Sequence, residues 1–202
     1  MEIGVYTFVD TGRDPATGQQ TGAAAERTRR ISLTSAVTAL SSDAWRSHGA
    51  RNYWRRAERF APYVDLYPDA PTRSGHDLAK MHVSINSQAH IALNSRDAAN
   101  EFFPAYSEVM SRIGRERGWP PTTRAQYDAA RTKRGALFVG IPQEIVDKIL
   151  FQHGIFGHQR FLAQIGIGSM PHAKIMQAIE LLGSHVAPAV RNAIGETQTV
   201  TN

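Results

Sequence analysis

The sequence contains no cysteine, which excludes disulfide bonds, thiolate metal sites and cysteine nucleophiles. It also contains no apolar run of about 18 residues, the length that a membrane-spanning helix needs, so we expect no membrane span. The first ten residues include Glu2 and Asp10 and lack a basic start, so we expect no signal peptide. Together these absences predict a cytoplasmic protein.

The motifs of the common catalytic and nucleotide-binding sites are absent as well. There is no Gly-x-Gly-x-x-Gly loop, no phosphate-binding P-loop and no His-Glu-x-x-His pair. The eight histidines show none of the tight spacing that would hold a metal ion. Local motifs therefore predict neither a metal site nor a particular reaction.

The composition is typical of one globular domain. Apolar residues make up 42% of the 202 residues and charged residues 20%, as in an ordinary folded protein with a hydrophobic core. We therefore expect a single domain over residues 1–202, with a frayed tail at 195–202.

The net charge of +5 comes from one segment. Residues 13–59 hold nine arginines and four acidic residues, whereas basic and acidic residues balance in the rest of the chain. This segment also carries Trp45, Tyr53 and Trp54, so it could attract phosphates or stack nucleic-acid bases. A packed helix with a solvated, arginine-rich surface is the favoured interpretation, and we do not expect nucleic acid as a partner.

Hydrophobic periodicity predicts alternating strands and helices. Strands are expected at 2–9, 31–40, 81–92 and 160–167, with a short strand-like segment at 135–140. Helices are expected after Asn94, from Pro142 and from about Pro171, the last weakening near Pro188. Alternation of strand and helix in the C-terminal half predicts an α/β fold with a parallel sheet.

The segment 81–92 has the clearest strand pattern. Apolar residues alternate along it with polar ones, namely His82, Ser84, Asn86, Gln88 and His90. Such a polar face could point into a ligand cavity, as at the mouth of a barrel, or could be the solvated face of an edge strand. The pattern alone leaves both interpretations open.

Two glycine-containing turns follow strand-like segments. In the segment 140–142 the amides that open a helix could hold an anion, but Ile141 offers no capping side chain. Gly166, Gly168 and Ser169 could let the backbone approach a ligand closely, although a simple turn is the favoured interpretation.

Longer stretches, in chain order, carry a family resemblance. They are MEIGVYTFVDTGRDPATG, AERTRRISLTSAVTALSSD, and a nearly continuous C-terminal stretch with HVSINSQAHIA, DAANEFFPAYSEVMSRIGRERGWPP, RGALFVG, KILFQHGIFGHQRFLAQ and MPHAKIMQAIELLGSHVAPAVR. In these stretches the chain resembles the luciferase-like, flavin-dependent monooxygenases, whose fold is a (β/α)8 barrel.

Parts of that barrel are missing from the chain. Segments expected between Thr21 and Ala23 and between Asp43 and Phe60 are absent, and 43–59 stands as an unmatched basic insert. The resemblance therefore implies an α/β fold built as an incomplete or shortened (β/α)8 TIM-type barrel, with parallel strands and outer helices. Exposed strand edges of such a barrel predict a homo-oligomer.

The resemblance also implies a flavin site. Eight residues would bind the cofactor: Tyr6, Thr7, Phe8, Ala36, Val37, Ser84, Asn86 and Gln88. Tyr6, Thr7 and Phe8 would end the first strand near the flavin. The pair Ala36 and Val37 matches the cis peptide that supports the isoalloxazine ring in bacterial luciferase. Ser84, Asn86 and Gln88 would face the barrel interior. The implied cofactor is FMN in its reduced form, with a deazaflavin as the alternative.

By this resemblance the chain is expected to be a flavin-dependent oxidoreductase or monooxygenase of the luciferase-like type. It would use reduced flavin and oxygen on a small organic substrate, with a flavin reductase as a partner. The alternative is a non-catalytic, degenerate barrel that acts as a flavin-binding or protein-interaction module.

Overall fold

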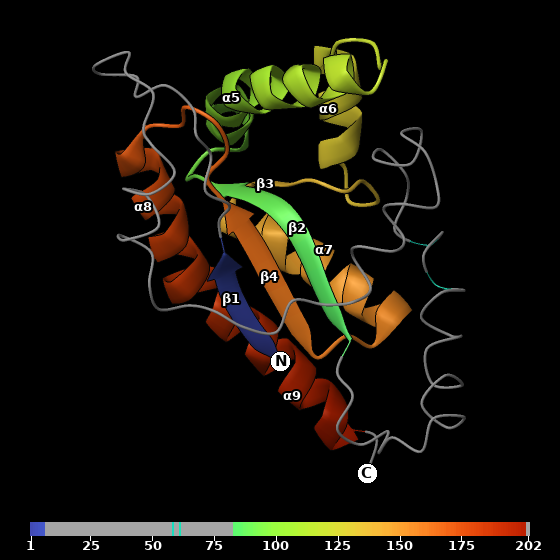
Figure 1. The fold of residues 1–202 in the computed structure, drawn as a ribbon. Coiled ribbons are helices and arrows are strands. Elements are labelled where there is room, and N and C mark those ends of the chain that lie inside the picture. The colour runs from blue at the N-terminus through green and yellow to red at the C-terminus, as the bar shows by residue number, and fades with distance from the viewer. Residues whose placement is uncertain (7–57, 59–60, 62–82, 201–202) are drawn as a thin grey trace, which may run out of the picture.

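The computed structural model describes residues 1–6, 58, 61 and 83–200. Its elements are β1 (Glu2–Tyr6), β2 (Ser84–Ile91), α5 (Ser95–Glu116), α6 (Arg124–Arg131), β3 (Phe138–Gly140), α7 (Pro142–Phe156), β4 (Arg160–Ile165), α8 (His172–Leu181), a π-helical turn η4 (Leu182–Val186) and α9 (Ala187–Val200) (Figure 1). The strand predicted at 31–40 and, apart from residue 58, the insert 43–59 lie outside the described residues.

The described strands form one parallel sheet in the order β1-β4-β2-β3. The expected α/β fold with parallel strands is therefore confirmed. The pairing of β1 with β4 joins the start of the chain to a strand near its end, as happens where a (β/α)8 barrel closes. The sheet is thus compatible with a TIM-type fold, but its four described strands do not form a closed barrel.

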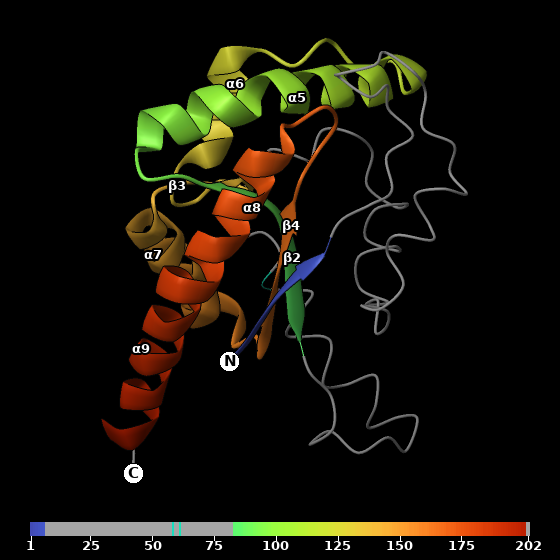
Figure 2. The same ribbon diagram turned by 90° about the vertical axis from the view of Figure 1, so that its left-hand side faces the viewer.

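One face of the sheet carries the main hydrophobic core. The register aligns Ile3 of β1, Phe161 of β4 and Ile85 of β2 in one row across the sheet. These side chains belong to or pack against a core built with α7, α8 and α9. Figure 2 shows these three helices on the same side of the strands, as the expected outer helices of a barrel would lie.

A second core lies at the carboxyl ends of the strands, under α5 and α6. Phe102 and Tyr106 of α5 and Tyr127 of α6 are fully buried there. Their ring centroids lie 5.4 to 6.5 Å apart, the spacing at which aromatic pairs attract beyond their buried area. This aromatic cluster fixes α5 across the end of the sheet (Figure 1).

Local signals explain where the helices begin. The side chain of Asn94 accepts hydrogen bonds from the amides of Arg96 and Asp97 at 2.8 and 3.2 Å, which caps α5 at the predicted residue. Pro142 opens α7 as its first residue, also as predicted. These two helix starts are therefore confirmed.

The last helical region is continuous but not regular. The π-helical turn η4 separates α8 from α9, and Pro188 follows in the first turn of α9. Proline lacks an amide hydrogen, so a helix accepts it most easily where the regular hydrogen-bond ladder is already interrupted. The predicted weakening near Pro188 therefore corresponds to the irregular turn before it. Of the helices that the structure describes, none is long and apolar enough to cross a membrane.

Candidate functional site

The face of the sheet opposite α7, α8 and α9 is polar. Because side chains alternate along a strand, the even-numbered residues of β2, which alternate with Ile85, Ala89 and Ile91 of the core face, lie on this opposite face. They include Ser84, Asn86 and Gln88, three of the residues that the sequence predicts for a flavin site. We call this side the polar face.

The register brings residues of three strands together at one end of the polar face. Tyr6 of β1 pairs with Gln164 of β4, which pairs with Gln88 of β2. This row lies toward the carboxyl ends of the strands, the end at which TIM-type folds place their active sites. The sequence did not predict Gln164 as a member of this row, because the pattern of the segment 160–167 indicates only a buried strand.

Gln88 carries an unsatisfied polar atom. Its Oε1 is buried and has no hydrogen-bond partner within the part of the chain that the structure describes. A buried acceptor without a donor costs about 1–3 kcal/mol, and such a group in a native protein calls for a ligand, a water or a role. This atom is therefore a candidate ligand contact on the polar face.

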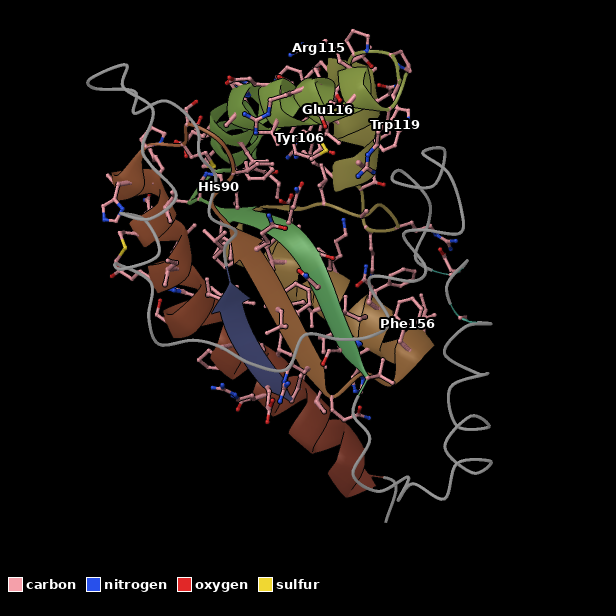
Figure 3. The ribbon with its side chains drawn as sticks, viewed as in Figure 1. His90, Tyr106, Arg115, Glu116, Trp119 and Phe156 are labelled. Atoms are coloured by element: carbon pink, nitrogen blue, oxygen red, sulfur yellow. The ribbon has the colours of Figure 1, made fainter. Side chains whose placement is uncertain are left out.

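Three titratable side chains contact one another near His90, two residues after Gln88 in β2. Nε2 of His90 is 3.0 Å from Oε2 of Glu101, and Nζ of Lys174 is 2.6 Å from Oε1 of the same carboxylate. β2, α5 and α8 each supply one member. Figure 3 shows His90 at the end of the sheet next to α5.

Burial dominates the electrostatics of His90. The residue is 1% exposed, and burial lowers its pKa, although the hydrogen bond and charge of Glu101 act to raise it. Burial raises the pKa of Glu101, but its hydrogen bonds from Lys174 and His90 outweigh this and leave that pKa below its usual value. Near neutral pH, His90 is thus neutral, and Glu101 is a carboxylate with a lysine partner.

Two contacts fix the position of His90. Its ring stacks on Phe102 at a centroid distance of 5.8 Å and an interplanar angle of 13°. Its Nε2 is held by Glu101, while its Nδ1 is buried with no hydrogen-bond partner among the described residues. The sequence places His90 on the polar face but gives no sign of Glu101 or Lys174, which reach it only through the tertiary fold.

The two glycine-containing turns have structural roles. The amide of Ile141 donates to Oε2 of Glu144 at 3.1 Å. A side chain of α7 therefore already accepts the hydrogen bond of an amide that could have held an anion. Gly168 has a φ of +54°, and a Cβ there would lie 3.0 Å from a methyl group of Val109. The second turn therefore packs closely on α5, in line with the favoured interpretation of a simple turn.

Part of the predicted flavin site lies beyond what the structure describes. Thr7, Phe8, Ala36 and Val37 lie outside the described residues, and for Tyr6 the structure gives the place of the backbone in the register. Within residues 1–6, 58, 61 and 83–200, no group of three or more His, Cys, Asp or Glu residues could hold a metal ion.

Comparison with known proteins adds information on the fold. No family model matches the chain, and no curated protein matches it. The solved structure of the monooxygenase RslO1 from Streptomyces bottropensis matches with a TM-score of 0.55 and 20% identity, over 65% of this chain and 38% of that one. The riboflavin lyase RcaE, solved with modified FMN and riboflavin, matches with a TM-score of 0.43 and 14% identity, over 72% of this chain and 37% of that one.

The likeness to RslO1 shows a shared fold over about two thirds of this chain. The chain spans well under half the length of either solved protein. A fold by itself does not specify a reaction, because many activities share one architecture. The luciferase-like family therefore stays a prediction, and the function has to be argued from the site.

Proposed function

We propose that this chain is a flavin-dependent monooxygenase or related oxidoreductase of the luciferase-like type, which binds FMN over the polar face. The observation that carries the proposal is the buried Oε1 of Gln88, which has no partner among the described residues. Gln88 is in register with Gln164 and Tyr6 at the carboxyl ends of three parallel strands. The sequence resemblance and the fold shared with a monooxygenase support the same assignment.

The polar face fits the chemistry of a flavin. The isoalloxazine ring ends in an imide, an N–H group between two carbonyl groups. The primary amide of a glutamine can accept from that N–H and donate to a neighbouring carbonyl. Such a pair would satisfy Oε1 of Gln88.

When bound, reduced flavin supplies the oxygen-transfer chemistry. The chain's own residues would bind the ring, orient it and exclude water. Gln88 Oε1 and the His90 side chain are buried at this end of the polar face, and a low local dielectric strengthens each polar contact formed there. A small organic substrate beside the flavin and a separate flavin reductase complete the proposal.

The test is an FMN titration of the wild type and of a Gln88→Leu variant, followed by quenching of flavin fluorescence. Loss of the hydrogen bonds should weaken binding by about 1–3 kcal/mol, or roughly 5- to 150-fold. Gln152→Leu is a matched control, because the Oε1 of Gln152 is likewise buried with no partner among the described residues, but Gln152 lies on α7 in the helical layer.

Equal affinity of the Gln88→Leu variant and the wild type would contradict the proposed site. FMN binding without turnover of any substrate in the presence of a flavin reductase would favour the alternative, a non-catalytic flavin-binding module. Oxygen consumption that depends on both reduced FMN and an added organic substrate would favour the monooxygenase.

A further inference from the structure

His158 is a fully buried histidine whose ring makes no hydrogen bond among the described residues. It is 0% exposed, and neither Nδ1 nor Nε2 has a partner in that part of the chain. A neutral imidazole carries one N–H donor and one acceptor, so both groups are left unsatisfied. Each costs free energy, and a native protein that keeps such a residue calls for an explanation.

The backbone beside His158 joins the amino ends of three strands. Gln159, the next residue, donates its amide to the carbonyl oxygen of Val83 at 3.0 Å, and its own carbonyl oxygen accepts from the amide of Glu2 at 2.9 Å. Its side-chain Oε1 accepts from the amide of Val83 at 2.8 Å. Val83 precedes β2, Glu2 begins β1 and Gln159 precedes β4, so these three residues hold the starts of the strands together (Figure 1). We call them the strand junction.

A second histidine packs against the first. His153, in the last turn of α7, meets the ring of His158 at a centroid distance of 5.5 Å. Burial, with a smaller contribution from His153, lowers the pKa of His158 from 6.5 to about 4, and burial and the amino group of Met1 lower the pKa of His153. Glu2 and Arg160, the charged residues at the junction, pair with each other. In the described part of the chain, no carboxylate offsets these effects on either histidine.

We propose that His158, with His153 against it, is an acid-sensitive latch at the strand junction. In neutral solution the uncharged ring stays buried and the junction stays closed. In mild acid the imidazole takes a proton from solvent only when the junction opens and lets water reach the ring, because an unpaired charge is costly to bury. The amino ends of β1 and β4 then separate, while the second core under α5 and α6 stays packed. The latch lies at the opposite end of the strands from Gln88, so it does not depend on whether a flavin binds.

Opening should begin at the junction because few buried contacts hold it. β1 is five residues long and pairs with β4 alone in the described sheet. Glu2 is exposed, and Ile3 and Val5 are only partly buried, whereas the aromatic cluster under α5 is fully buried. Segments with few buried contacts open at a lower free energy than the whole molecule unfolds.

The direction and size of the effect follow from linkage. The closed form binds a proton with a pKa of about 4, whereas the open form exposes His158 with its ordinary pKa of 6.5. The contribution of the neutral ring to the closed junction is therefore complete above pH 6.5 and is lost as the pH falls from 6.5 toward 4. The equilibrium constant for opening should rise by up to about tenfold per pH unit, and by at most roughly 300-fold across this window.

Amide hydrogen exchange of the full chain, followed by NMR and corrected for the intrinsic exchange rate, measures the opening. The amides of Glu2 and Gln159 report the junction, and the buried Tyr127 of α6 reports the second core. Between about pH 6.5 and about pH 5, the opening constant at the junction should rise roughly 15-fold in the wild type. The rise at Tyr127 should be much smaller.

His158→Leu removes the titrating ring and should leave the opening constant at the junction nearly independent of pH. His185→Leu is the matched control, since His185 lies on η4 and is exposed; it should behave like the wild type. The same pH dependence in His158→Leu as in the wild type would overturn the proposal. A rise of equal size at Tyr127 would do so too, because it would mean that the whole molecule unfolds.

NMR titration of the histidine rings gives a test without a variant, which matters if leucine disturbs the packing. The ring of His158 in the wild type should stay neutral down to about pH 5 while exchange at the junction increases. A ring that titrates near its ordinary pKa, with no change in exchange at the junction, would overturn the proposal. The ring would then take up its proton in the closed form.

Discussion

Replacement of the buried residue Lys148 should change how the free energy of unfolding depends on pH. Its side chain is 3% exposed, and Nζ donates to the carbonyl oxygens of Arg131, Thr132 and Leu137 at 3.4, 2.7 and 2.6 Å. Two of these carbonyl groups belong to the carboxyl end of α6, so Lys148 caps that helix from α7. The substitution Lys148→Met keeps an unbranched side chain, one atom shorter, and removes all its donors.

The magnitude follows from the pKa of Lys148. Burial, with a smaller contribution from Arg131, lowers this pKa from 10.5 to about 7. The unfolded chain therefore binds more protons than the folded chain between pH 7 and 10.5, so the stability of the wild type rises with pH across this window. The difference in pKa corresponds to about 5 kcal/mol in total, with a slope of at most about 1.4 kcal/mol per pH unit.

Urea unfolding of the wild type and of Lys148→Met, followed by circular dichroism through this window, measures the effect. The difference in unfolding free energy between the two proteins should grow by several kcal/mol in favour of the wild type as the pH rises. Titration of other groups affects both proteins and cancels in the difference. A difference that does not change with pH would refute the reasoning, because it would mean that the three carbonyl groups keep Lys148 fully charged.

Three further predictions concern single residues. Thr123→Ala removes the oxygen that accepts from the amide of Gln126 at the start of α6 and should cost about 1 kcal/mol in chemical denaturation with unchanged FMN affinity. Gly135→Ala would place a Cβ 2.1 Å from the carbonyl oxygen of Ala130, so we expect a loss of several kcal/mol or no folded protein by circular dichroism. Burial lowers the pKa of His158 from 6.5 to about 4, so the wild type should lose stability as the pH falls from 6.5 toward 4, and His158→Leu should remove that part of the acid sensitivity measured by urea unfolding.

Features of the fold that depend on neighbouring residues could be predicted from the sequence. The strand at 81–92 follows from strict alternation and appears as β2. The starts of α5 and α7 follow from Asn94 and Pro142, whose backbone preferences act locally. The polar face follows from the same alternation once β2 is covered by helices on its other side.

Features that depend on distant contacts could not be predicted. Gln164 lies beside Gln88 because β4 inserts between β1 and β2, an order that the pattern of a single strand does not contain. Glu101 and Lys174 reach His90 from two separate helices. In sequence, Glu101 and Lys174 are ordinary charged residues on amphipathic helices. Only the packing of α5 and α8 against the end of the sheet brings them together.

The central claim is that the polar face binds a flavin. The most direct test is titration of the purified wild-type protein with FMN, oxidised and reduced, followed by fluorescence quenching. The account predicts saturable binding with a dissociation constant in the micromolar range or tighter. Absence of binding at about 100 μM, which corresponds to roughly −5.5 kcal/mol, would contradict it.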